Sequence, residues 1–295
     1  MFLYSNVSFL LVKLRTSLDT SDQKEYAEIK RRLETDAETG GRRLQMNIKD
    51  YVPIPELEKC RNLLCIQPHP DDNEVGAGAT IAKLAGNGCR ITYLTVTDGS
   101  KGTDDPRISV QELAGIRRKE TEDAGKLLGV SSFRYLDYVD GSYPDERELC
   151  ERIVPVIREV RPEIVMTVDP FLPYEVHPDH RRVGMAAAQA CLFASNIHFG
   201  IAGGKLPEKW DVNGVAFQST AYPNTFVDVD DTWEIRNKAI LAHKSQFDPK
   251  SFELLGMYFD YKSRQYAEGK DFERAEAFKV LAPICLHMSV DTIGL

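Results

Sequence analysis

The sequence predicts an α/β fold in which a mainly parallel, Rossmann-like sheet is flanked by helices. The first observation behind this prediction is that short apolar runs alternate with longer helical segments through most of the chain. The second is that glycine or proline stands at the ends of many of these segments. The third is size, because 295 residues with 42% hydrophobic and 28% charged residues suit one large globular domain.

In the first half of the chain, the run 63–66 is short and wholly apolar, as in a buried strand. A helix is expected at 77–85, before Gly86 and Gly88, and a strand at 90–96. A long amphipathic helix at 110–128 ends at Gly129, and a strand follows at 133–136. Helix 146–160 is expected to stop before Pro162 and to lead into an apolar strand at 164–168.

In the second half, the alanine-rich segment 182–194 predicts a helix. Strands are expected at 215–220 and 224–229, and helices at 233–247 and 252–267, with 273–281 as a closing segment. At the other end of the chain, residues 16–43 are dense in charge, which indicates a solvated extension. We therefore expect an N-terminal extension over 1–45 and a single domain over 46–295.

Composition also limits the partners and the compartment. A net charge of −8 argues against nucleic-acid binding, which favours a basic surface. No apolar stretch approaches the length of a membrane span, and the N-terminus lacks the features of a signal peptide. The six cysteines are scattered, without a Cys-x-x-Cys pair, so free thiols in a reducing cytoplasm are expected.

A turn rich in functional groups follows the first apolar run. It contains His69, Asp71 and Asp72, and the prolines Pro68 and Pro70 stiffen it. In open α/β sheets, ligands bind beyond the carboxyl ends of the strands. A histidine and an aspartate three residues apart suit one zinc ion, with Asp71 left as an acid or base. The alternative is an ordinary turn in which an aspartate caps the next helix.

A second turn, His177-Pro178-Asp179-His180, follows the apolar run 164–168. Three of the six histidines thus fall in two His-Pro-Asp turns, which favours a shared site over two ordinary turns. Gly76-Ala77-Gly78 suggests a dinucleotide site, but the third glycine of that motif is absent, so we discount NAD or FAD.

The two turns resemble those of the LmbE-like, or PIG-L, family of zinc-dependent deacetylases, which act on N-acetylglucosamine-containing molecules. Further matching segments are Thr97-Asp98-Gly99, Leu128-Gly129-Val130 and His243-Lys244-Ser245-Gln246. The segment 169–175 looks most like the diacetylchitobiose deacetylase branch. The resemblance implies removal of an acetyl group from a chitobiose-like sugar by a homo-oligomer, and the composition adds a cytoplasmic location with no nucleic-acid or membrane partner. Alternatives are a deacetylase of a glucosaminyl conjugate in thiol synthesis, or a sugar-binding relative without activity.

The resemblance also assigns roles to individual residues. It implies that His69, Asp72 and His180 hold one Zn²⁺ per subunit and leave a position open for water. Asp71 would be the general base. His177 would stabilise the oxyanion and protonate the leaving amine.

Other assignments leave two interpretations open. Asp179 either orients His177 or caps the following helix, or does both. Arg117 and Asp140 correspond to positions that hold sugar hydroxyls, although Arg117 is equally suited to pair with Glu120 or a helix neighbour. Asp98 either faces the same crevice or caps its own loop.

We also considered a role in the site for three further residues. His243 either supports the site or is structural, and His287 is expected to complete a neighbouring subunit's pocket. Some relatives have a tyrosine two residues before His177. Here Glu175 occupies that position and Tyr174 precedes it, which puts an oxyanion role for Tyr174 in question.

Overall fold

The computed structural model describes residues 54–199, 208–287, 289 and 291–295. Residues Ile54–Met288 form one compact unit, and residues 289–295 belong to a second one. The N-terminal extension expected over 1–45, and the expected start of the domain at residue 46, lie outside the described residues. The helices and strands of the structure lie in the first unit.

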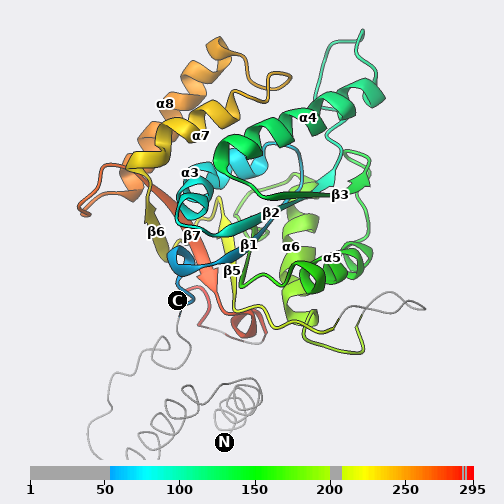
Figure 1. Ribbon diagram of the computed structural model, residues 1–295, viewed down its shortest axis with the longest axis vertical. Helices are drawn as coiled ribbons and strands as arrows, with labels where there is room; N and C mark the ends of the chain where they lie inside the picture. Colours follow the sequence, from blue (N-terminus) through cyan, green and yellow to red (C-terminus); the bar gives the residue numbers. More distant parts are fainter. Residues whose placement is uncertain (1–53, 200–207, 288, 290) are drawn as a thin grey trace, which may run out of the picture. The chain divides into compact units, whose positions relative to one another are not determined.

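A seven-stranded sheet forms the centre of this unit (Figure 1). Its order is β3-β2-β1-β4-β5-β7-β6. The five strands from β3 to β5 run parallel, and β7 is antiparallel to both of its neighbours. The strands are β1 (Asn62–Gln67), β2 (Arg90–Thr97), β3 (Ser132–Tyr138), β4 (Ile164–Val168), β5 (Gly214–Gln218), β6 (Thr225–Asp228) and β7 (Ala275–Leu281).

Helices cover both faces of the sheet, with α3, α4 and α7 on one side and α5 and α6 on the other (Figure 1). Every residue of β1, β4 and β5 is accordingly buried, as expected for strands covered on both faces. The helices are α3 (Asp72–Gly86), α4 (Val110–Leu128), α5 (Glu146–Val160), α6 (Pro178–Phe193), α7 (Trp233–Ile240) and α8 (Pro249–Tyr266). Short 3₁₀ turns are η2 (Leu57–Lys59), η3 (Asp230–Thr232) and η4 (Pro283–Leu286).

Local sequence signals set the helix ends. The Ser109 hydroxyl accepts the Glu112 N–H at 3.2 Å at the start of α4, and Gly129 ends that helix in the left-handed region at φ 83°. Asp145 caps α5 in the same way through two backbone N–H groups. These signals explain why the predicted limits of α4 and α5 are confirmed.

Other element limits differ from the prediction. Helix α3 begins at Asp72 and α6 at Pro178, so both predicted active-site turns run directly into a helix. Helix α7 ends at Ile240 rather than at 247, because the following residues leave the helix to form a loop against α4. The closing segment 273–281 contains strand β7, which pairs with β5 and β6.

The sheet topology determines where a site can form. From β1 the chain proceeds outward through β2 to β3, then returns to place β4 on the other side of β1. The carboxyl ends of β1 and β4 therefore flank the point where the strand order reverses, and ligands bind at such points in open α/β sheets. Helix α6 packs closely against β4 there. The distance is so short that a Cβ added to Gly184 would be 2.7 Å from the Val168 carbonyl oxygen.

Candidate active site

The loops after β1 and β4 bring the three histidines of the predicted site together. The His69 ring centroid is 5.2 Å from that of His180 and 4.7 Å from that of His177. The rings of His177 and His180 are stacked, with centroids 4.7 Å apart. The two turns therefore form one site, as the sequence predicted.

Three side chains of this site form a donor set that fits a divalent metal ion. His69 Nδ1 lies 3.4 Å from Asp72 Oδ2, and His180 Nε2 lies 3.5 Å from Asp72 Oδ1. One ligand atom from each residue falls within 4.8 Å of the other two. Two imidazole nitrogens and one carboxylate oxygen are the donors of a catalytic zinc site that keeps one position open. The residues present therefore fit the metal that the family resemblance implies.

The far side of the His69 ring faces two further carboxylates. Its Nε2 lies 3.4 Å from Asp140 Oδ1 and 3.4 Å from Asp179 Oδ2. Burial works against protonation of this ring, yet its carboxylate neighbours, Asp140 above all, raise the pKa of His69 to about 12. The surroundings are thus strongly negative, which also favours a divalent cation.

This arrangement changes the interpretation of Asp179 and adds to that of Asp140. Asp179 does not cap α6, because the N-cap residue of this helix is His177. Its Oδ2 instead accepts the Gly141 N–H at 3.0 Å and faces His69. Asp140 accepts the Lys101 N–H at 3.1 Å through its other oxygen. Both aspartates therefore hold the His69 ring, a contact that sequence spacing gives no means to foresee.

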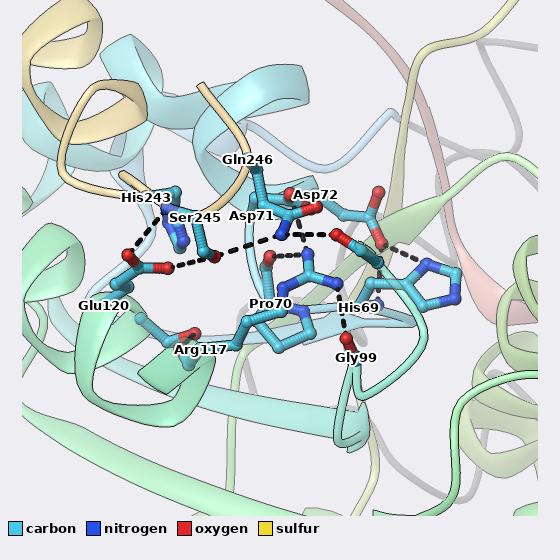
Figure 2. A network of polar contacts seen from close by, with 12 residues as sticks. His69, Pro70, Asp71, Asp72, Gly99, Arg117, Glu120, His243, Ser245 and Gln246 are labelled. Carbon is cyan, nitrogen blue, oxygen red and sulfur yellow. Dashed lines mark hydrogen bonds and ion pairs between the residues drawn. The ribbon is translucent and has the colours of Figure 1, made fainter. Parts of the chain in front are cut away.

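The predicted base, Asp71, has a strained backbone and a charged partner. Its φ is 129°, a value that non-glycine residues rarely adopt and that is maintained only by surrounding contacts. The Arg117 guanidinium donates to Asp71 Oδ2 at 2.9 Å (Figure 2). Burial raises the pKa of Asp71 to about 6, although the charge of Arg117 opposes the shift. A carboxylate with a pKa near 6 is well matched to accept a proton at neutral pH.

Arg117 lies beneath the first turn and is almost fully buried. Its guanidinium also donates to the carbonyl oxygens of Pro70 at 2.6 Å and Gly99 at 3.0 Å (Figure 2). Glu120, the other partner considered for it, instead accepts the Ser245 N–H at 2.8 Å and the Ser245 hydroxyl at 2.6 Å. The alternative prediction, that Arg117 pairs with Glu120, is therefore wrong. Contact between Arg117 and a sugar stays a prediction.

His177 is exposed at the rim of the site and its backbone N–H donates to Glu175 Oε1 at 2.7 Å. Desolvation and the neighbouring rings of His69 and His180 lower the pKa of His177. A lowered pKa makes its protonated ring a stronger acid. His177, Asp179 and His69 also form a second group of ligand atoms within 4.8 Å of one another.

The remaining predicted residues occupy different places. Asp98 Oδ1 accepts the N–H groups of Ser100 and Asp140, each at 3.0 Å, so its loop-capping role is confirmed. His243 is fully buried, with Nε2 3.3 Å from Glu74 Oε2. His287 is exposed and follows η4. It follows β7, whose carboxyl end lies at the amino ends of the parallel strands, because β7 runs antiparallel to β5.

Two acidic residues of the site were not predicted. Glu74, on the first turn of α3, is fully buried against His243, and an acidic residue in a first helical turn usually signals only helix stability. Glu175 Oε2 lies 3.1 Å from Nδ1 of the proposed ligand His180. The only sequence signal for Glu175 was its place where some relatives have tyrosine. Tyr174 itself is 98% exposed.

Known proteins resemble this chain along most of its length. The family model described as PIG-L, GlcNAc-PI de-N-acetylase, matches residues 64–191. Diacetylchitobiose deacetylase of Thermococcus kodakarensis is 38% identical over 248 residues, which cover 83% of this chain and 91% of that protein. A deacetylase of Kineococcus radiotolerans that acts on 1D-myo-inositol 2-acetamido-2-deoxy-alpha-D-glucopyranoside is 31% identical, covering 57% of this chain and 54% of the relative.

A solved structure supports the same relationship. N,N′-diacetylchitobiose deacetylase of Pyrococcus horikoshii, in complex with an inhibitor, superposes with a TM-score of 0.76 at 35% identity. The match covers 81% of this chain and 90% of that one. The expected α/β architecture is thereby confirmed. Within the part of the chain that the structure describes, no helix is both long and apolar enough to cross a bilayer.

Proposed function

This chain belongs to the PIG-L family of metal-dependent deacetylases, and we propose that it removes the N-acetyl group from an N-acetylglucosamine-type sugar resembling chitobiose. The observation that carries this proposal is the convergence of His69, Asp72 and His180 next to Asp71, whose backbone is strained. The names of the relatives from Thermococcus and Pyrococcus support a chitobiose-like substrate. The reaction breaks the amide C–N bond, forms a C–O bond with water, and yields acetate and a free amine.

One zinc ion per chain would be held by His69 Nδ1, an oxygen of Asp72 and His180 Nε2. This donor set suits zinc, although iron(II) and cobalt(II) accept the same ligands. The chemistry that such an ion supplies when bound is an acidified water and a polarised carbonyl. Asp140 and Asp179 hold the His69 ring in place from its far side.

Asp71 is the group that takes a proton from the attacking water. It follows His69 by two residues and directly precedes Asp72, so its carboxylate lies beside the metal ligands without being one of them. Arg117 keeps this carboxylate oriented and supports its ionised form. A base of this kind contributes about 10²–10⁴-fold to a rate.

His177 supplies the opposite function at the rim. A protonated ring at this position donates to the oxygen that becomes negative as the carbonyl is attacked. The same ring then gives its proton to the departing nitrogen. Asp71 and His177 thus form a base and acid pair with different environments.

The same residues are compatible with two alternative functions. The first alternative is a glucosaminyl conjugate as substrate, which is supported by a relative from Bacillus cereus named "Probable N-acetyl-alpha-D-glucosaminyl L-malate deacetylase 2" that is 33% identical over 135 residues. A sugar-binding protein without activity is disfavoured, because the base and all three ligands are present. A homo-oligomer completed by His287, a cytoplasmic location and a single domain from residue 46 stay predictions.

An amine-release assay combined with metal analysis tests the proposal. Purified protein would be given N-acetylglucosamine, its disaccharide and glucosaminyl malate in N-acetylated form. We expect one zinc per chain and the fastest acetate release from the disaccharide. Faster turnover of the malate conjugate would favour the first alternative. Bound zinc without any acetate release would favour the second.

A further inference from the structure

The two histidines proposed as metal ligands share one pattern of contacts. Each ring directs one nitrogen toward Asp72 and the other toward a carboxylate outside the ligand set. For His69 the outer carboxylates are Asp140 and Asp179, and for His180 the outer carboxylate is Glu175, whose Oε2 is 3.1 Å from Nδ1. The family-based prediction gave no role to Glu175.

We propose that Glu175 is a positioning residue that fixes the tautomer and the ring orientation of His180 for metal binding. This inference rests on the proposed function, because it needs His180 to be a ligand. A neutral imidazole carries one proton, and only the nitrogen without it can bind a metal ion. When Nδ1–H donates to Glu175, Nε2 is left free on the side of Asp72. Such contacts between a ligand histidine and a carboxylate raise the affinity for the metal.

The carboxylate of Glu175 is itself held in place. Its Oε1 accepts the His177 N–H at 2.7 Å, so the side chain cannot turn away without leaving that N–H unpaired. Its backbone oxygen accepts a hydrogen bond from Arg181 Nη1 at 3.1 Å, and its backbone N–H donates to Leu172 O at 3.2 Å. Each oxygen of Glu175 therefore has a separate partner, and Oε2 is the one that faces His180.

A narrower role is also consistent with these contacts, since Glu175 could serve only to stabilise the turn before α6 through the His177 N–H. The two roles predict different results. Loss of a turn contact lowers the midpoint of thermal unfolding without changing which nitrogen of His180 is protonated. Loss of the positioning contact changes the protonated nitrogen and weakens the binding of metal.

The test uses the full chain with Glu175→Ala and Glu175→Gln, and with Glu253→Gln on an exposed position of α8 as a matched control. Zinc affinity is measured by competition with a chromophoric chelator. The tautomers of ¹⁵N-labelled histidine are read by NMR in the chelator-treated protein. We expect Glu175→Ala to weaken zinc binding about 10–100-fold. The Nδ1–H form of His180 should decrease, while His69 and the Glu253 variant stay like wild type.

The outcomes separate this inference from the proposed function. Zinc affinity within about twofold of wild type in both Glu175 variants, or an unchanged His180 tautomer, would overturn the role of Glu175 while leaving the deacetylase proposal standing. A wild-type chain that binds no zinc would overturn both. A lower unfolding midpoint with an unchanged tautomer would assign Glu175 to the turn alone.

Discussion

Replacing Arg117 with methionine should destabilise the protein through the carboxylate of Asp71. The guanidinium is 4% exposed and donates to Asp71 at 2.9 Å and to two backbone carbonyl oxygens. Removing one partner of a buried ion pair leaves the other charge uncompensated, at a cost of about 3–5 kcal/mol. Asp71 is 15% exposed, so water offsets part of this cost and we expect about 3 kcal/mol.

The assay is urea unfolding of the metal-free protein for Arg117→Met, Asp71→Asn and the double variant. Because the Asp71→Asn change replaces the carboxylate with an uncharged amide, the double variant should be more stable than the sum of the single losses predicts, with a coupling of about 0.5–3 kcal/mol. Arg118→Met is the control, since Arg118 is 46% exposed and its pairing with Asp137 is worth at most about 1 kcal/mol.

The loss of stability caused by Arg117→Met should also depend on pH. Burial raises the folded-state pKa of Asp71 from 3.8 to about 6, so its stability contribution is fully present below 3.8 and is lost as pH rises through about 6. Removing Arg117 takes away a charge that lowers this pKa, so the deficit should grow toward about pH 8 and shrink toward about pH 5. A variant within about 0.5 kcal/mol of wild type at about pH 8, or a coupling near zero, would refute this reasoning.

Three further predictions concern the site and the packing of α6 beside it. Asp71→Asn should retain one zinc per chain but lower kcat by about 10²-fold or more, measured by metal analysis and acetate release; unchanged turnover would contradict its role as base. His180→Ala should lose most of its zinc whereas His177→Ala should keep it and turn over slowly, and equal retention would contradict this division. Gly184→Ala should lower the free energy of unfolding, measured by chemical unfolding, by about 1–3 kcal/mol, because the added methyl would lie 2.7 Å from Val168 O. An unchanged free energy of unfolding would mean that α6 moves freely relative to β4.

Much of the fold was predictable, because the spacing of apolar residues, the capping residues and the glycines at helix ends are local signals. Helices α4 and α5 and strand β4 begin and end where the sequence indicates. The end of α7 was not predictable, since Ser245 leaves the helical pattern to bind Glu120 on α4. That contact joins residues far apart in the chain, so no local pattern reveals it.

For the site, residue type and spacing were enough to select the residues that converge, but not to assign their partners. His69, Asp72 and His180 lie together as expected. The contacts of Asp179 with His69 and of Arg117 with Asp71 depend on how loops from different strands meet. The backbone strain at Asp71 is likewise a product of the tertiary structure.

The pairing of β1 with β4 has a consequence for the order in which the molecule assembles. Leu63 lies opposite Ile164, so one edge of β1 stays unpaired until a segment far along the chain docks against it. Contacts between such distant segments form slowly because a long loop must close first. A refolding chain therefore brings the proposed metal ligands together only once the middle of the sheet has closed, and zinc uptake would report that event.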